Sequence, residues 1–169
     1  MNQIHNKIII IGDAGRGKTT MAAELSKRLG IKHYSTDDFY YEIKFTKPRS
    51  REDSLDKISK VYYEDKWIVE GTTQWLLKPG LDSADIIIYL KYDSILHQWL
   101  ALIKRHFTRK DETVIQTLLL MRHVFYKRYG LSYKKGKLTH TEVLAPYKHK
   151  VITLSSFEEI NNFLNHLTM

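Results

Sequence analysis

The stretch that decides the fold is KIIIIGDAGRGKTT, which spans residues 7–20. Its four consecutive isoleucines are typical of a strand that is buried on both faces of a parallel sheet. Gly12, Gly17, Lys18 and Thr19 then complete the pattern G-x-x-x-x-G-K-[ST] without a mismatch. Glycines at these positions let the backbone form a nest of N–H groups around phosphate, and the following helix adds the positive end of its dipole.

This motif predicts a site for ATP or GTP together with Mg²⁺. Lys18 would reach the β- and γ-phosphates, and the Thr19 hydroxyl would bind the metal. The alternative is a glycine-rich turn that binds nothing, and it is disfavoured because strand and helix patterns flank a complete motif. The residues expected to contact the nucleotide are Gly12, Asp13, Ala14, Gly15, Arg16, Gly17, Lys18, Thr19 and Thr20.

The rest of the chain alternates short apolar runs with helical patterns, which indicates a parallel sheet covered by helices. Strands are predicted at residues 7–11, 33–35, 67–69, 86–90 and 151–154. Helices are predicted at residues 18–29, 50–64, 94–107 and 111–129, and a last one after Ser155 and Ser156. The expected fold is therefore α/β, with a five-stranded parallel sheet in a single domain over residues 1–169.

Composition limits the classes of protein that fit. A hydrophobic fraction of 43% and a charged fraction of 27% are ordinary for a soluble domain. The chain has no cysteine, which excludes disulfides and Cys-ligated metal centres. The apolar run before Gly12 is too short for a signal peptide, and no stretch approaches the twenty apolar residues of a membrane helix. We therefore expect a cytoplasmic protein with no membrane partner.

The positive charge is concentrated in one quarter of the chain. The formal net charge is +8, and residues 101–150 hold 12 Lys and Arg against 3 Asp and Glu. Such a region suits phosphate groups on a nucleotide or on nucleic acid. A solvated helix face in a basic protein explains the charge equally well. A nucleic-acid partner is thus an open, but not the favoured, interpretation.

Two carboxylates follow predicted strands and should face the phosphate loop, because ligands bind at the carboxyl ends of parallel strands. Asp37 lies in the expected loop after the second strand, where it could accept the proton of a substrate hydroxyl or hold water on Mg²⁺. Capping of the next helix is the alternative. Glu70 ends the third strand at the Walker B position, where a carboxylate holds the metal. An ordinary surface carboxylate is the alternative there.

These two segments resemble known kinases. The DDFY of residues 37–40 resembles the Asp-x-Phe-Tyr loop of uridine kinases and the Asp-Asp-Phe-Phe loop of nicotinamide riboside kinases, which implies that Asp37 is the catalytic base. The VEG that contains Glu70 is similar to the Val-Glu-Gly of uridine-kinase-like enzymes. Adenylate kinases grip the acceptor phosphate with two arginines, and Tyr41 and Gln74 stand at those positions here. That difference argues against an acceptor that already carries a phosphate.

Taken whole, the chain resembles the adenylate-kinase-like branch that includes DNA topology modulation proteins of the FlaR type. The agreement covers residues 5–110 and 148–167. It includes the phosphate loop, an Asp-x-x-Tyr-aromatic segment, a Trp-Ile-Ile-Asp-Gly-like third strand and an Ala-Asp-aliphatic fourth strand. The resemblance implies a P-loop nucleotide kinase fold with a helical basic lid at about residues 104–140. The label of the branch does not fix a substrate.

The lid of such kinases brings arginines onto the transferred phosphate and excludes water. Arg105 and Arg109 are the candidates, because the guanidinium can bind two phosphate oxygens at once. The apolar residues of the two flanking helices recur at helical spacing and are expected in the core: Trp99, Leu100, Ile103, Leu118, Met121 and Phe125. The eight histidines show no metal-ligand spacing, so no zinc site is predicted.

The sequence thus favours an ATP-dependent phosphotransferase that acts on a hydroxyl of a small acceptor, for which a nucleoside is one candidate. The predicted catalytic residues are Lys18, Asp37, Arg105 and Arg109, and the predicted metal-binding residues are Thr19 and Glu70. The acceptor should lie beside Asp37, Tyr40, Tyr41 and the helix at residues 50–64. A nucleoside monophosphate kinase and a nucleic-acid-associated NTPase of the DNA topology modulation type are the alternatives. The acceptor and the oligomeric state are left open by the sequence.

Overall fold

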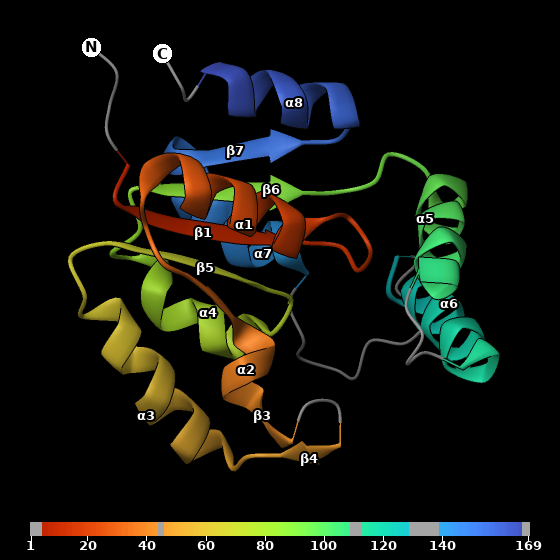
Figure 1. Ribbon diagram of the computed structural model, residues 1–169, viewed down its shortest axis with the longest axis horizontal. Coiled ribbons are helices and arrows are strands. Elements are labelled where there is room, and N and C mark those ends of the chain that lie inside the picture. Colours follow the sequence, from red (N-terminus) through yellow and green to blue (C-terminus); the bar gives the residue numbers. More distant parts are fainter. Residues whose placement is uncertain (1–4, 44–45, 109–112, 129–138, 167–169) are drawn as a thin grey trace.

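A five-stranded parallel sheet forms the centre of the molecule, in the order β2-β5-β1-β6-β7 (Figure 1). The computed structural model describes residues 5–43, 46–108, 113–128 and 139–166. The strands are β1 (Lys7–Gly12), β2 (His33–Ser35), β5 (Trp67–Gly71), β6 (Ile86–Leu90) and β7 (Val151–Leu154). The predicted sheet is therefore confirmed.

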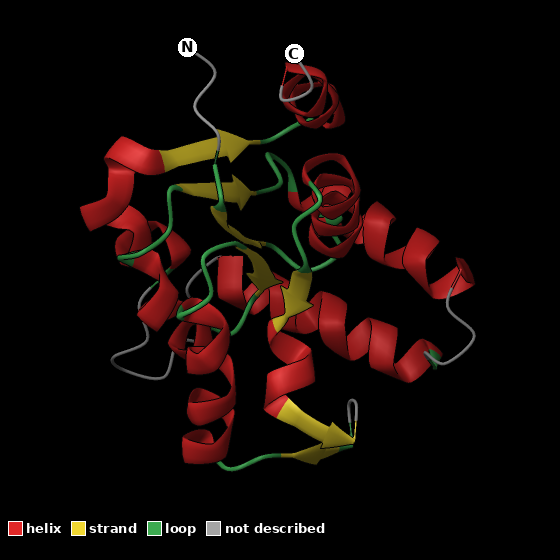
Figure 2. Cartoon of the chain, turned by 60° about the vertical axis from the view of Figure 1, so that its left-hand side comes forward, coloured by secondary structure: helices red, strands yellow, loops and turns green. Residues whose placement is uncertain are grey.

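Helices cover both faces of this sheet (Figure 2). Because side chains alternate along a strand, Ile8 and Ile10 of β1 pack under α1 and α8, and Ile9 and Ile11 pack on the opposite face. All four are buried, and full burial of one such side chain contributes on the order of 2 kcal/mol. The covering helices are α1 (Lys18–Leu29) and α8 (Phe157–His166) on the first face, and α3 (Arg51–Tyr62), α4 (Gln74–Leu81) and α7 (His140–Leu144) on the second.

Local signals set several helix ends where the sequence predicts them. Gly17 and Gly30 flank α1 with φ angles of 82° and 67°, in the left-handed region that glycine tolerates. The Ser50 hydroxyl accepts a hydrogen bond from the Asp53 N–H at 3.1 Å and caps α3. Both helices therefore begin and end close to their predicted bounds.

Other elements differ from the prediction. Residues 36–40, expected as part of a loop, form the short helix α2 (Thr36–Tyr40), since the Ser35 side chain caps its first turn. A small antiparallel pair follows, β3 (Tyr41–Ile43) and β4 (Lys47–Pro48). The sequence also did not predict α4, which contains Pro79 and Gly80, or α7 and the 3₁₀ helix after it (Ala145–Lys150).

The two long helices α5 (Ile95–Thr108) and α6 (Val114–Arg128) pack against each other at one side of the sheet (Figure 1). Their existence is predicted correctly, but the placement of their apolar residues is partly wrong. Trp99, Met121 and Phe125 are half-buried. Leu100, Ile103 and Leu118, expected in the core, are 62%, 40% and 58% exposed. Within the described residues, no helix is long and apolar enough to cross a membrane.

Candidate phosphate-binding and catalytic site

The phosphate loop between β1 and α1 has a backbone that requires glycine. Gly12, Gly15 and Gly17 have φ angles of 155°, 80° and 82°. A Cβ atom on Gly12 would lie 1.9 Å from the Leu90 carbonyl oxygen of the neighbouring strand. The Asp13 N–H donates to that same carbonyl oxygen at 3.0 Å. The loop therefore leaves β1 through a close contact with β6 that a side chain would prevent.

Hydrogen bonds hold this loop against the segment that follows β6. The Tyr92 hydroxyl donates to the Gly15 carbonyl oxygen at 2.9 Å, and the Tyr92 N–H donates to Asp13 Oδ2 at 3.2 Å. Arg16 Nε donates to the Lys91 carbonyl oxygen at 2.9 Å. Burial raises the pKa of the Tyr92 phenol, and nearby Arg16 opposes that rise. The side chains of Asp13 and Arg16 thus shape the loop.

The side chain of Arg16 is buried between two aromatic rings beside the phosphate loop. Its guanidinium lies 4.7 Å from the centre of the Tyr92 ring and 4.8 Å from that of the Phe157 ring, and the residue is only 2% exposed. Cation–π contacts of a desolvated guanidinium stabilise such a stack. The sequence placed Arg16 among the nucleotide contacts, and in this structure its side chain makes protein contacts between two aromatic rings.

Lys18 and Thr19 begin α1 at the mouth of the loop. Lys18 is 9% exposed, and its Nζ donates to the Asp13 carbonyl oxygen at 2.9 Å. The ammonium group therefore lies over the loop. Thr19 and Thr20 are exposed. This is the arrangement in which a lysine and backbone N–H groups can surround phosphate oxygens.

Glu70 comes from the end of β5, the strand that pairs with β1. It lies opposite Ile10 in the β1–β5 register, and it is only 3% exposed. The Thr19 hydroxyl donates to Glu70 Oε1 at 2.9 Å. The contact joins residues 51 positions apart and brings together the two predicted metal-binding side chains.

These two oxygens fit a Mg²⁺ site. Mg²⁺ prefers hard oxygen ligands and is bound in kinases by one or two protein oxygens together with phosphate and water. Thr19 and Glu70 supply a hydroxyl and a carboxylate at one point. Within the described ranges, no cluster of three or more acidic, His or Cys side chains could hold a metal ion. A metal held by these two side chains would take its other ligands from phosphate oxygens and water.

Asp37 is fixed near the same edge by the neighbouring strand. Ser35, the last residue of β2, lies opposite Glu70 in the β2–β5 register, and Asp37 follows two residues later. The Asp37 N–H donates to Ser35 Oγ at 3.4 Å, and the Asp37 residue is half-buried. The sequence predicted that Asp37 lies in a loop, whereas in the structure it belongs to the first turn of α2.

A close contact between Thr36 and Gly71 positions α2. Thr36 is fully buried, and a Cβ atom on Gly71 would lie 1.8 Å from its Oγ1. Thr36 Oγ1 is one of the buried side-chain oxygens that makes no hydrogen bond within the described structure. Glycine after Glu70 therefore allows α2, and with it Asp37, to approach the tip of β5.

The segment after Asp37 is held by Arg49 and by aromatic rings. Arg49 Nη1 donates to the carbonyl oxygens of Asp38 at 3.0 Å and Phe39 at 3.4 Å, and makes a shorter contact with that of Tyr41. The Arg49 Nε lies 3.4 Å from Asp53 Oδ2. The ring of Tyr40 packs against those of Tyr41 and Trp75, at centroid distances of 4.6 and 6.1 Å. The guanidinium of Arg49 thus satisfies main-chain carbonyl oxygens at the end of α2 by hydrogen bonding.

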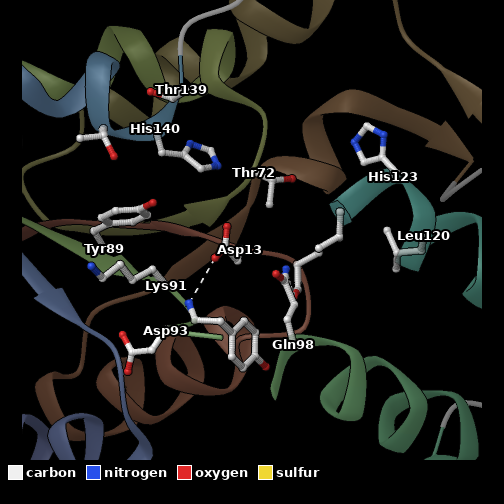
Figure 3. Close-up of a pocket in the computed structure, with 14 residues that line it drawn as sticks. Asp13, Thr72, Tyr89, Lys91, Asp93, Gln98, Leu120, His123, Thr139 and His140 are labelled. Atoms are coloured by element: carbon white, nitrogen blue, oxygen red, sulfur yellow. Dashed lines mark hydrogen bonds between the residues drawn. The ribbon is translucent and has the colours of Figure 1, made fainter. Parts of the chain in front are cut away.

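A cavity of about 670 Å³ lies between the phosphate loop and the helices α5, α6 and α7 (Figure 3). His140 at the start of α7 is 4% exposed, and its Nδ1 lies 3.2 Å from Gln74 Nε2. Polar groups dominate the wall beside the loop. The labelled lining residues in Figure 3 are Asp13, Thr72, Tyr89, Lys91, Asp93, Gln98, Leu120, His123, Thr139 and His140.

Sequence reasoning did not find this wall. The one local signal is Thr139, whose hydroxyl and N–H form a capping box with Glu142. That pattern predicts a helix start but not its position beside Gln74, 66 residues earlier. The sequence predicted Arg105 and Arg109 as lid residues. Arg105 belongs to α5, and Arg109 lies outside the described residues.

Three curated proteins are similar to parts of the chain, whereas no family model matches it. The uncharacterized protein YqaC of Bacillus subtilis is 40% identical over 65 residues, which cover 38% of this chain and 36% of that protein. An adenylate kinase of Streptomyces avermitilis is 33% identical over 82 residues, or 48% of this chain and 35% of the kinase. A cytidylate kinase of Desulfurococcus amylolyticus is 31% identical over 94 residues, or 56% and 46%. The chain thus matches between a third and a half of the length of these relatives.

Solved structures resemble the whole chain at low identity. The shikimate kinase from Acinetobacter baumannii in complex with shikimate has a TM-score of 0.56 and 15% identity, with 96% of this chain and 90% of that chain covered. A gluconokinase from Sinorhizobium meliloti has a TM-score of 0.55 and 11% identity, with 96% and 89% covered. The chain therefore has the α/β P-loop kinase fold, as the sequence predicts. The adenylate-kinase-like branch stays a prediction.

Proposed function

We propose that this protein transfers the γ-phosphoryl group of ATP or GTP to a hydroxyl of a small acceptor, with Mg²⁺ as cofactor. The observation that carries the proposal is the contact of Thr19 Oγ1 with Glu70 Oε1 at 2.9 Å, beside Lys18 and the phosphate loop. It joins a hydroxyl and a buried carboxylate where a metal would meet the β- and γ-phosphates. The similarity to parts of adenylate and cytidylate kinases supports the same reaction class.

The residues of the phosphate loop and of β5 have different parts in the proposed reaction. Lys18 would exchange its 2.9 Å contact with the Asp13 carbonyl oxygen for phosphate oxygens, and the loop N–H groups would hold the β-phosphate. Thr19 and Glu70 would bind Mg²⁺, which neutralises charge on the phosphates. These groups act mainly by position and charge, since phosphoryl transfer asks little covalent chemistry of the protein.

Asp37 would handle the acceptor proton. The acceptor oxygen forms a bond to the γ-phosphorus while the bond from that phosphorus to the β–γ bridging oxygen breaks. The hydroxyl proton would pass to the Asp37 carboxylate, which follows two residues after Ser35, the residue opposite Glu70 in the β2–β5 register. Arg105 and Arg109 would supply the positive charge that neutralises the transferred phosphate.

The two alternatives differ in what they ask of the cations. A nucleoside monophosphate kinase needs positive groups for the acceptor phosphate, but Tyr41 and Gln74 stand where adenylate kinases have arginines. The nearby Arg49 is engaged with main-chain carbonyl oxygens of α2. A nucleic-acid-associated NTPase would instead use the basic residues 101–150. A hydroxyl acceptor without a phosphate is favoured because Tyr41 and Gln74 carry no positive charge, and because Arg49 already binds main-chain carbonyl oxygens.

A screen of nucleosides, nucleotides and small hydroxylated metabolites tests the proposal, with nucleoside triphosphate consumption and thermal shift as readouts. We expect Mg-ATP or Mg-GTP to stabilise the protein, and one class of acceptor to drive triphosphate consumption. Lys18→Ala should abolish both effects, because it removes the side-chain cation aimed at the phosphates. Lys27→Ala, on the exposed side of the same helix, is the matched control. Unchanged stabilisation of the Lys18→Ala protein by both nucleotides would refute the proposal.

A further inference from the structure

Exposed apolar side chains gather on the α5–α6 hairpin. Of the twelve large apolar residues that are exposed in the described part of the chain, eight lie on these two helices. Four belong to α5, namely Leu96, Leu100, Ile103 and Phe107. Four belong to α6, namely Val114, Ile115, Leu118 and Leu119. We call these eight residues the apolar stripe. A monomer rarely leaves such a group in water without a use for it.

The spacing places the stripe on the outer face of the hairpin. On α5 its members recur at intervals of three and four residues, which is one side of a helix. The buried residues Gln98 and Leu102 lie on the opposite side of α5. On α6 the buried residues Thr117 and Val124 likewise point inward, away from Leu118. The inner faces therefore serve the packing of this chain, and the outer faces are left for another surface.

The size of the stripe matches what a stable interface needs. Its members are between 40% and 82% exposed. With roughly 150 Å² for each fully exposed member, the lower end of the range for aromatic side chains, the stripe offers up to about 750 Å². The largest apolar patch of a typical monomer is about 300–600 Å². Each partner in a standard protein–protein interface buries about 800 Å². The stripe alone can thus supply most of one partner's share.

We propose that the apolar stripe is the interface of a homodimer, in which the α5–α6 hairpins of two copies pack face to face. A second copy supplies an equally apolar surface of equal area, and two-fold pairing buries both stripes at once. Two antiparallel hairpins joined in this way form a four-helix arrangement. This inference is independent of the proposed phosphoryl transfer.

The charges of the hairpin give the dimer a distinctive response to salt. Neither α5 nor α6 contains an acidic residue, and the exposed cations Lys104 and Arg122 lie beside the stripe. Two copies would therefore bring like charges near each other, and salt screens that repulsion. Dimerisation should strengthen as the salt concentration rises from about 50 mM to about 500 mM. Binding to an anionic lipid surface or to nucleic acid should weaken over the same range.

The test is the mass of the full chain in solution at micromolar concentration, measured by light scattering after size exclusion and by sedimentation. We expect twice the chain mass of 20.0 kDa for the wild type. The double variant Leu100→Glu with Leu118→Glu should have the single mass, with unchanged circular dichroism because both positions are exposed. Ile43→Glu, at a position that is 60% exposed outside the hairpin, should remain dimeric.

Three outcomes would overturn the homodimer. The first is a monomeric wild type at the higher salt concentration. The second is a double variant that folds and is still dimeric. The third is a wild-type monomer that cosediments with vesicles of phosphatidylglycerol and phosphatidylcholine, loses this binding in the double variant and binds less as salt rises. That last result would assign the stripe to an anionic membrane surface.

Discussion

The carboxyl edge of the sheet and the α5–α6 hairpin differ in which kind of side chain they bury and which kind they expose. At the sheet edge, polar side chains are buried and each has a defined place: Arg16, Lys18 and Glu70 are all less than 10% exposed. On the hairpin, apolar side chains such as that of Phe107, which is 82% exposed, face water. Burying a polar group is costly unless it is paired, and exposing an apolar one is costly unless it is covered.

The difference teaches where to look for chemistry and where to look for partners. Buried polar groups at the ends of parallel strands are held to one geometry by the sheet register, which suits a catalytic site. A helical face without such constraints suits contact with another surface or with phosphate that arrives from outside. Substitutions in each of the two regions test this difference.

The largest effect is expected from Asp37→Asn at the sheet edge. This change keeps the size of the side chain but removes the base. Transfer to the acceptor should slow by ~10²–10⁴, while Mg-ATP still raises the melting temperature. Asp38→Asn, its exposed neighbour, should change the rate much less. If the Asp37→Asn protein transfers the phosphoryl group at near wild-type rate, Asp37 is not the catalytic base. An acceptor-independent ATPase lost equally in Asp37→Asn and Glu70→Gln would indicate an NTPase.

The next largest effect is expected from the double variant Arg105→Ala with Arg109→Ala, which should lower turnover by about 10²–10³ because it removes the two cations proposed to stabilise the transferred phosphate. Nucleotide affinity, measured by titration calorimetry, should change far less. Lys104→Ala is the matched control on the same helix. If turnover survives and salt-dependent DNA affinity collapses instead, the hairpin serves nucleic acid and the basic region is not a lid.

A smaller effect, with a distinct signature, is expected for Glu70→Gln. An amide oxygen binds Mg²⁺ more weakly than the carboxylate oxygen that the Thr19 hydroxyl contacts. The Mg²⁺ concentration needed for half-maximal activity should therefore rise roughly 10–100-fold. High Mg²⁺ should restore much of the rate. Glu52→Gln, an exposed glutamate on α3, should leave the requirement unchanged. A Glu70→Gln defect that no Mg²⁺ concentration relieves would argue against a metal role.

The smallest effect is on stability and concerns the contact that brings α2 to β5. Gly71→Ala should lower the free energy of unfolding by about 1–3 kcal/mol, because the added methyl meets Thr36 Oγ1. Thr36→Ala removes that oxygen, so the double variant should be less destabilised than the sum of the two single ones. Urea unfolding of all three measures this coupling. Strict additivity would show that the two positions do not compete for space.

Local signals in the sequence predicted the strands and the helix α1 at the sheet edge, but not the short helix α2. The bounds of α1 follow from Gly17 and Gly30, whose positive φ angles are a property of the residues themselves. The contact of Thr19 with Glu70 follows from a strand pattern that ends in a carboxylate beside the phosphate-loop strand. In both cases the relevant information lies within a few residues or in the order of parallel strands.

Features that depend on distant contacts were not predicted. Pro79 and Gly80 argue against a helix at α4, yet the helix forms and packs against Tyr62, whose hydroxyl donates to the Leu76 carbonyl oxygen at 2.8 Å. A Cβ on Gly80 would lie 2.3 Å from the Tyr62 ring, so the glycine serves this packing. Leu100 shows the converse, because helical periodicity predicted its helix but not the side that faces water.

The bracing of the phosphate loop has a consequence for the entropy of nucleotide binding. The carbonyl oxygens of Ala14 and Gly15 accept hydrogen bonds from Gln98 and Tyr92, and Arg16 is held by the Lys91 carbonyl oxygen. Fixing a backbone costs about 1–2 kcal/mol per residue, hence roughly 4–8 kcal/mol for residues 13–16. Folding has already met this cost before any phosphate arrives. Since about 1.4 kcal/mol corresponds to a tenfold change in affinity, a nucleotide loses little affinity to ordering this loop.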